Sequence, residues 1–131
     1  MGTRSLTHVK DESGATLVTI YRQYDGYPTG MGADLLAILR GRTVVNGYGV
    51  ESDSVSNGMG CLAATIVKRL KDSTGNVYIY PPDSIDCGEE YVYTITLSHG
   101  VPYLGIAAAG EAHVLHYGPA NDLTDERLGV L

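Results

Sequence analysis

The last third of the chain contains EYVYTITL-SHG-VPYLGIAA-AGE-AHVLHY at residues 90–117. The runs rich in β-branched and aromatic residues are 90–97, 101–108 and 112–117, and the short joints between them are 98–100 and 109–111. Such runs separated by brief Gly-containing turns predict antiparallel strands. Since NVYIY at 76–80 has the same character, we expect a four-stranded antiparallel meander over residues 76–117.

The N-terminal region predicts a second antiparallel unit. The runs RSLTHVK at 4–10 and TLVTIYRQY at 16–24 flank a polar loop that contains Gly14. This pattern is typical of a β-hairpin, because glycine readily adopts the positive φ that such loops require.

Between these two units, apolar residues recur at helical spacing in two segments. They predict helices over 33–40 and 60–71. The intervening residues 42–56 are polar and rich in glycine, so we expect a long surface loop there. At the C-terminus, Asn121 or Thr124 is a candidate N-cap for a short helical turn over 125–128.

This order of elements predicts one α+β domain over residues 1–131, with a mostly antiparallel sheet and both helices packed on one face. The sequence lacks the βαβ alternation that is typical of a parallel sheet. The length of 131 residues, with 44% hydrophobic and 18% charged residues, fits a single globular core.

Charge and hydropathy exclude several classes of function. The net charge of −6 disfavours binding to duplex nucleic acid, whose phosphates require a basic surface. No window approaches about 20 consecutive apolar residues, and the N-terminus lacks the apolar centre of a signal peptide. We therefore expect a cytoplasmic protein without membrane contact.

Two cysteines are too few for a disulfide framework or a four-thiolate zinc site. We expect free thiols, and neither a metal nor a cofactor. The chain also has ten tyrosines and no phenylalanine or tryptophan. Each tyrosine ring carries a hydroxyl that needs water or a partner, so we expect some rings to line a wet cleft and others to support self-association into a homo-oligomer.

Two similar glycine-rich segments precede the two expected helices. They are GMGA at 30–33 and NGMGC at 57–61, and their candidate ligand-binding residues are Gly30, Gly32, Asn57, Gly58 and Gly60. Unpaired N–H groups at a helix start attract anions. Neither segment matches a Walker or Rossmann pattern. The alternative is that these glycines only relieve crowding where the helices meet the sheet.

Polar and aromatic residues surround the first glycine-rich segment. They are Arg22, Tyr24, Asp25 and Tyr27. Arginine binds phosphate through two hydrogen bonds, and tyrosine stacks on bases. This set predicts a site for a nucleotide-like or other small anionic molecule, where loops 25–32 and 57–61 meet. The alternative is a surface ion pair between Arg22 and Asp25.

A thiol hydrolase is a different hypothesis. Cys61 lies near the start of an expected helix, where cysteine hydrolases place their nucleophile, and His113 or His116 is the candidate base. A regular strand would place these two histidines on opposite faces, which disfavours a shared metal. The acidic residues of loop 81–90 lack the pattern of a calcium-binding loop, which favours a solvated surface.

Several strings resemble a family of short phage and bacterial proteins that have no established activity. They are TRSL at 3–6, YRQYDGYP at 21–28, NGMGCLA at 57–63, YPP at 80–82 and DCGEEY at 86–91. The resemblance covers residues 2 to about 95 and implies a phage-type origin, with a host cytoplasmic location. It is compatible with a protein that sequesters a host nucleotide signal. The alternatives are the thiol hydrolase and a protein–protein adaptor without a ligand.

Overall fold

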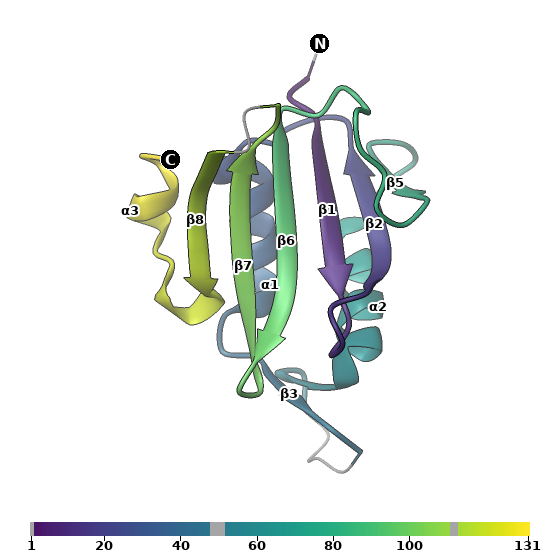
Figure 1. Cartoon of the computed structure of the whole chain (residues 1–131), viewed down its shortest axis with the longest axis vertical. Coiled ribbons are helices and arrows are strands. Elements are labelled where there is room, and N and C mark those ends of the chain that lie inside the picture. The colour runs from purple at the N-terminus through teal and green to yellow at the C-terminus, as the bar shows by residue number, and fades with distance from the viewer. Residues whose placement is uncertain (1, 48–51, 111–112) are drawn as a thin grey trace.

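The expected N-terminal hairpin is present in the computed structural model, which describes residues 2–47, 52–110 and 113–131 (Figure 1). Strand β1 (Ser5–Lys10) pairs antiparallel with β2 (Thr16–Arg22). The loop between them is held by Asp11, whose carboxylate accepts hydrogen bonds from the backbone N–H groups of Ser13 and Ala15. The chain reverses tightly there.

The meander is confirmed for three of its four strands. Strands β6 (Tyr91–Ser98), β7 (Val101–Ala108) and β8 (His113–Pro119) pair antiparallel in sequence order. Strand β5 (Val77–Tyr80) pairs instead with β2, at the opposite edge of the sheet. The strand order is therefore β5-β2-β1-β6-β7-β8. The expectation that β5 joins the meander is wrong.

One ladder inside the sheet is parallel. Strand β6 aligns parallel with β1, from Ser5 opposite Tyr91 to Val9 opposite Ile95. The hairpin leaves one edge of β1 unpaired, and the long connection at 81–90 lets β6 reach that edge in the same direction as β1. The α+β class with a mostly antiparallel sheet is confirmed, although the sheet contains this one parallel pair.

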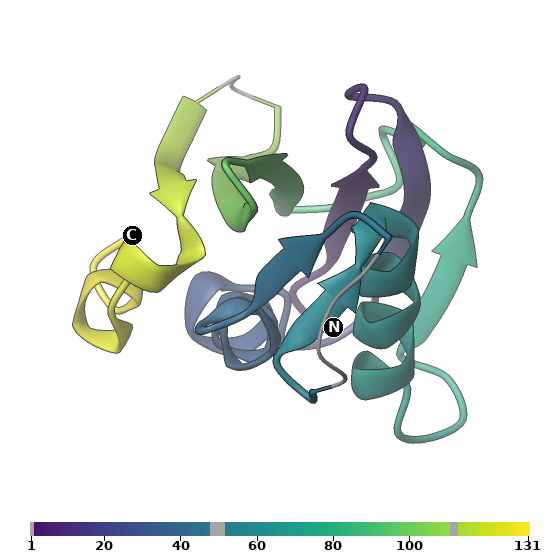
Figure 2. The ribbon, with the colours of Figure 1, turned by 90° about the horizontal axis from the view of Figure 1, so that it is seen from below.

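Both expected helices lie on one face of the sheet (Figure 2). A π-helical turn, η1 (Pro28–Gly32), leads into α1 (Ala33–Leu39), and α2 (Gly58–Leu70) follows later. The buried side chains of α1 are Leu35, Leu36, Ile38 and Leu39, and those of α2 include Met59, Leu62, Ile66 and Leu70. These side chains form one core with the inner face of the sheet.

The expected surface loop at 42–56 contains a second small sheet. Strands β3 (Thr43–Val45) and β4 (Val55–Asn57) pair in parallel. The Val44 N–H also donates to the Gly100 carbonyl at 2.9 Å, and the buried Arg42 donates to the Ser56 hydroxyl at 3.1 Å. These long-range hydrogen bonds give the polar segments at 43–45 and 55–57 a regular structure that their composition did not indicate. Residues 48–51 of the expected loop lie outside the described residues.

The C-terminal helical turn is confirmed as α3 (Asp125–Leu128), which follows a short turn of 3-10 helix, η2 (Ala120–Asp122). Thr124 is its N-cap, and its hydroxyl accepts a hydrogen bond from the Arg127 N–H at 3.2 Å. The tail lies beside β8 (Figure 1). Glu111 and Ala112, from the last expected turn and strand, lie outside the described residues.

The connection at 81–90 covers part of the sheet face that the helices leave open. Its first half binds β2, where the Asp83 N–H donates to the Thr19 hydroxyl at 3.0 Å. Its end binds the start of β1, where the Glu90 N–H donates to the Arg4 carbonyl at 2.9 Å. Leu6 of β1 is fully buried although it lies outside the main core cluster. The other half of this outer face, over β6–β8, keeps partly exposed side chains.

Among the described helices, none has the length and apolar character needed to span a membrane.

Candidate functional site

The first glycine-rich loop is folded tightly onto itself. The Gly30 N–H donates to the Tyr27 carbonyl at 2.9 Å, and the Met31 N–H donates to the Asp25 carbonyl at 2.8 Å. The buried Tyr93 hydroxyl donates to the Gly26 carbonyl at 2.7 Å. Two of the N–H groups that were expected to face an anion are therefore already satisfied within the loop.

Glycine is required at position 30, because a Cβ there would clash with the Asp25 backbone carbonyl oxygen. At Gly32 a Cβ would lie 3.3 Å from the Leu128 side chain, which is a tight contact. These contacts agree with the packing alternative for the first glycine-rich segment.

The aromatic residues of this region lie at the surface. Tyr24 is 53% exposed, and the Tyr27 hydroxyl donates to the Asp25 carboxylate at 3.0 Å. This hydrogen bond raises the pKa of Tyr27 above its usual value. The Tyr27–Asp25 pair thus forms a small exposed cluster beside the loop.

The second glycine-rich loop lies at the other end of the sheet. Gly58 has a positive φ of 82°, and the Met59 N–H donates to the Glu12 carboxylate at 3.1 Å. Glu12 belongs to the loop before β2, whereas loop 25–32 follows β2. The seven residues of β2 separate these two loops by roughly 20 Å. The expectation that they meet in one site is wrong.

The start of α2 is also partly occupied by the chain itself. The Asn57 side-chain oxygen accepts a hydrogen bond from the Gly47 N–H at 2.9 Å, and the Glu12 carboxylate faces the helix end. An approaching anion would meet this carboxylate. Gly60 lies in open space, where a Cβ would meet nothing within 4 Å.

The proposed thiol and histidines are not brought together. Cys61 is exposed on α2, which packs against β1 and β2. His113 and His116 lie on β8, four strands from β2, which corresponds to roughly 19 Å across a sheet. Figures 1 and 2 both place α2 and β8 on opposite sides of the molecule. The geometry does not form a Cys–His pair.

The two histidines differ from the expectation for a regular strand. An irregularity in the β7–β8 pairing aligns His113 with Ala108 and His116 with Ile106. Since Ala108 and Ile106 are two residues apart, these register positions share a face. Burial lowers the pKa of His116. Among the residues that the structure describes, no cluster of three or more metal-ligating side chains occurs.

The surroundings of Arg22 differ from those expected from the sequence. It ends β2 on the helix-covered side, and only 9% of the residue is exposed. Its Nε donates to the Tyr24 carbonyl at 2.7 Å, and its Nη1 donates to the Asp34 carboxylate at 2.6 Å. The alternative ion pair with Asp25 is replaced by this pair with Asp34 of α1.

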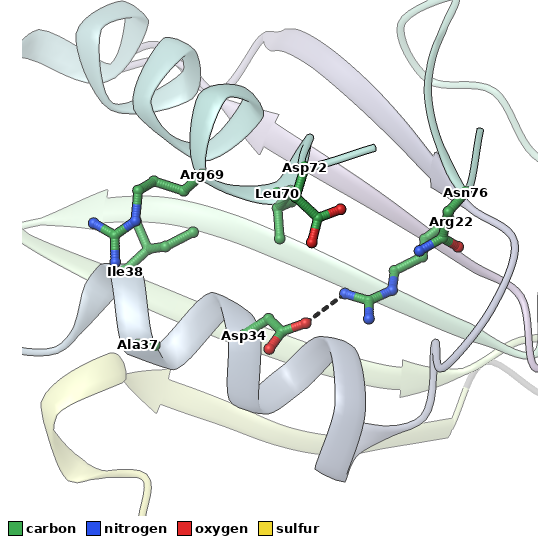
Figure 3. Close-up of a pocket in the computed structure, with 8 residues that line it drawn as sticks. All are labelled: Arg22, Asp34, Ala37, Ile38, Arg69, Leu70, Asp72 and Asn76. Carbon is green, nitrogen blue, oxygen red and sulfur yellow. Dashed lines mark hydrogen bonds and ion pairs between the residues drawn. The ribbon is translucent and has the colours of Figure 1, made fainter. Parts of the chain in front are cut away.

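Arg22 lines a polar cavity of about 230 Å³ beside α1, the end of α2 and the segment that follows it (Figure 3). The lining residues are Arg22, Asp34, Ala37, Ile38, Arg69, Leu70, Asp72 and Asn76. Arg22 alone among them was a candidate from the sequence. This cavity is the candidate functional site.

The lining polar groups come from three elements and one connection. Arg22 ends β2, Asp34 lies in the first turn of α1, and Arg69 lies in the last turn of α2. Asp72 and Asn76 lie between α2 and β5. Arg69 was not among the candidates from the sequence. The signal available in the sequence was that Arg69 and Asp72, two residues of opposite charge, lie three positions apart. This spacing did not show that β2 and α1 would complete the cavity.

Several of these groups retain capacity for hydrogen bonds. In the described part of the chain, neither Arg69 nor Asp72 takes part in an ion pair within 4.0 Å. The Asn76 side-chain oxygen accepts from the Tyr24 N–H at 2.9 Å, which commits its acceptor but not its amide donors. The cavity therefore presents guanidinium, amide and carboxylate groups together.

Comparisons with known protein families, with curated proteins and with solved structures find no match to this chain. Membership in the phage-type family stays a prediction.

Proposed function

We propose that the protein binds a small metabolite with an anionic group, and that the site is the cavity of Arg22 and Arg69. The observation that carries this proposal is the buried guanidinium of Arg22 at the wall of a polar cavity. Hydrogen bonds to the Tyr24 carbonyl, the Asp34 carboxylate and the Met31 sulfur fix its orientation. A guanidinium held in this way is preorganised, so less side-chain entropy is lost when a ligand binds.

Arg69 supplies a second cationic group. It points toward α1 across the cavity from Arg22 (Figure 3), and both side chains line the same space. In a protein with a net charge of −6, an anion is held only where local donors overcome the overall field. The pair of guanidinium groups provides such a place.

The size of the cavity restricts the ligand. Ligand pockets usually enclose about 300–1,000 Å³, and this cavity has about 230 Å³. The proposal therefore favours a compact metabolite over a dinucleotide. We keep the hypothesis that the protein sequesters a host signal, with a compact metabolite as the ligand and binding without turnover.

Calorimetry with small carboxylates and phosphates tests the proposal. Arg69→Ala should weaken binding about 10- to 100-fold, as expected for loss of a hydrogen bond to a charged group. Lys68→Ala is the matched control, because Lys68 is an exposed cation on the same helical turn that does not line the cavity. Equal affinities for both variants would refute this site.

Self-association is a second candidate, favoured by the outer face of β6–β8. Val114 and Tyr117 are 63% and 61% exposed, and the Tyr117 ring lies 5.6 Å from that of Tyr103. Aromatic residues are enriched in protein–protein interfaces. Light scattering at tens of micromolar tests this, and Tyr117→Ser should then shift a dimer toward monomer. A monomeric wild-type protein would remove the candidate.

A further inference from the structure

We infer that the ligand of the Arg22–Arg69 cavity is a compact zwitterion, with a cationic group beside Asp72 and an anionic group beside Arg69. This inference rests on the proposed function and assigns the chemical class of its ligand. Its starting observation is that two carboxylates, those of Asp34 and Asp72, line the same cavity as the two guanidinium groups.

The two carboxylates have different surroundings. The Asp34 carboxylate is paired with the Arg22 Nη1 at 2.6 Å, although its side chain remains 52% exposed. The Asp72 carboxylate has no ion-pair partner within 4.0 Å in the described part of the chain. Figure 3 shows it directed from the end of α2 toward the space between Asp34 and Arg22. Asp72 is thus a free anionic group at the cavity wall.

This charge pattern disfavours a ligand that is only anionic. Such a ligand gains from Arg69 and from the remaining donors of Arg22, but it also approaches Asp72, and like charges repel at close range. A ligand that is only cationic meets the reverse difficulty at Arg69. A molecule with both charges satisfies both unpaired groups, and it leaves the Arg22–Asp34 pair intact.

The position of the two free groups requires the ligand charges to be apart. In Figure 3 the Arg69 guanidinium extends beside Ile38, whereas the Asp72 carboxylate lies on the other side of Leu70, toward Arg22. With about 230 Å³ of space, the class that fits is a short ω-amino acid, whose two charges stand at opposite ends of its chain.

The test compares three matched probe series at the intact protein. They are unbranched ω-amino acids, dicarboxylates and diamines of three to six carbons, with binding followed by calorimetry and by amide NMR shifts around residues 69–76. One ω-amino acid should bind at least 10-fold more tightly than the diacid and diamine of equal length. A dicarboxylate that binds as tightly would overturn the zwitterion inference.

The Asp72→Asn variant gives a result whose sign decides the question. It should weaken binding of the ω-amino acid about 10-fold and strengthen binding of the dicarboxylate, because it removes a partner for the first and a repulsion for the second. Asp53→Asn, an exposed acid outside the cavity, should change neither. Stronger binding of every anion-bearing probe to Asp72→Asn would overturn the inference and retain the proposed anion site.

A third outcome concerns the proposed function itself. If none of these probes, nor inorganic phosphate, shifts the amides of residues 69–76 in the wild-type protein, both the zwitterion inference and the anion site are wrong. Circular dichroism and urea unfolding of each variant confirm that the changes in affinity are measured on folded protein.

Discussion

Replacing Arg22 with alanine should destabilise the protein in the absence of any ligand. Two strong interactions are lost, together with a weak contact of Nη1 with the Met31 sulfur at 3.3 Å. The Nε hydrogen bond to the Tyr24 carbonyl has a charged donor in a largely buried position, and such bonds contribute about 1.5–3 kcal/mol. The ion pair with Asp34 adds about 0.2–1 kcal/mol, since the Asp34 side chain is 52% exposed and water screens the attraction.

The expected decrease in the free energy of unfolding is therefore about 2–4 kcal/mol. Urea denaturation followed by circular dichroism measures it, and urea is preferred because guanidinium would screen the ion pair. Asp34→Asn is the matched comparison. It removes the ion pair but keeps the Tyr24 bond, so its loss should stay below about 1 kcal/mol.

Two outcomes for the loss of unfolding free energy in these variants would refute this reasoning. If Arg22→Ala costs less than about 1 kcal/mol, the buried guanidinium does not hold the end of β2. If Asp34→Asn costs as much as Arg22→Ala, the ion pair rather than the backbone hydrogen bond dominates. Since Arg22 is expected to support the fold, tests of ligand binding are better made at Arg69 and Asp72.

Three further changes are expected to alter stability. Glu12→Ala should cost about 0.5–2 kcal/mol by removing the acceptor of the Met59 N–H at the start of α2, and Glu12→Gln should cost less in thermal denaturation because it keeps an acceptor. Tyr93→Phe should cost about 1–3 kcal/mol in urea, because it leaves the Gly26 carbonyl without its buried donor; an unchanged midpoint would contradict this. Burial, aided by Lys10, lowers the pKa of His8 below its ordinary 6.5, so the unfolded state binds more protons and the free energy of unfolding should fall as pH drops below 6.5. His8→Gln should flatten that slope in urea titrations at pH 7.5 to 5, and an identical slope would show that His8 does not contribute.

The elements were largely predictable from local sequence. The first hairpin, both helices, the β6–β8 meander and the short C-terminal helix all follow from hydrophobic periodicity and short turns, which depend on residues close together in the chain. Thr124 as an N-cap belongs to this group, since a cap acts within one helical turn.

Long-range partners were not predictable in this way. The apolar pattern of β5 marks it as a strand but does not say which edge it joins, and only the path of residues 81–90 places β5 beside β2 and β6 beside β1. The strands at 43–45 and 55–57 were missed because their regularity depends on pairing with each other and on the Gly100 carbonyl.

The candidate site was likewise predictable only in part from the local sequence. Sequence alone indicated Arg22, because an arginine at a strand end beside a glycine-rich loop is a plausible anion ligand. It also placed both glycine-rich loops in one site, which the direction of β2 prevents, because they lie at opposite ends of that strand. Tertiary packing decided the surroundings of Arg22. Asp34 pairs with it, and Arg69 and Asp72 line the same cavity, only when α1 and α2 pack on one face of the sheet.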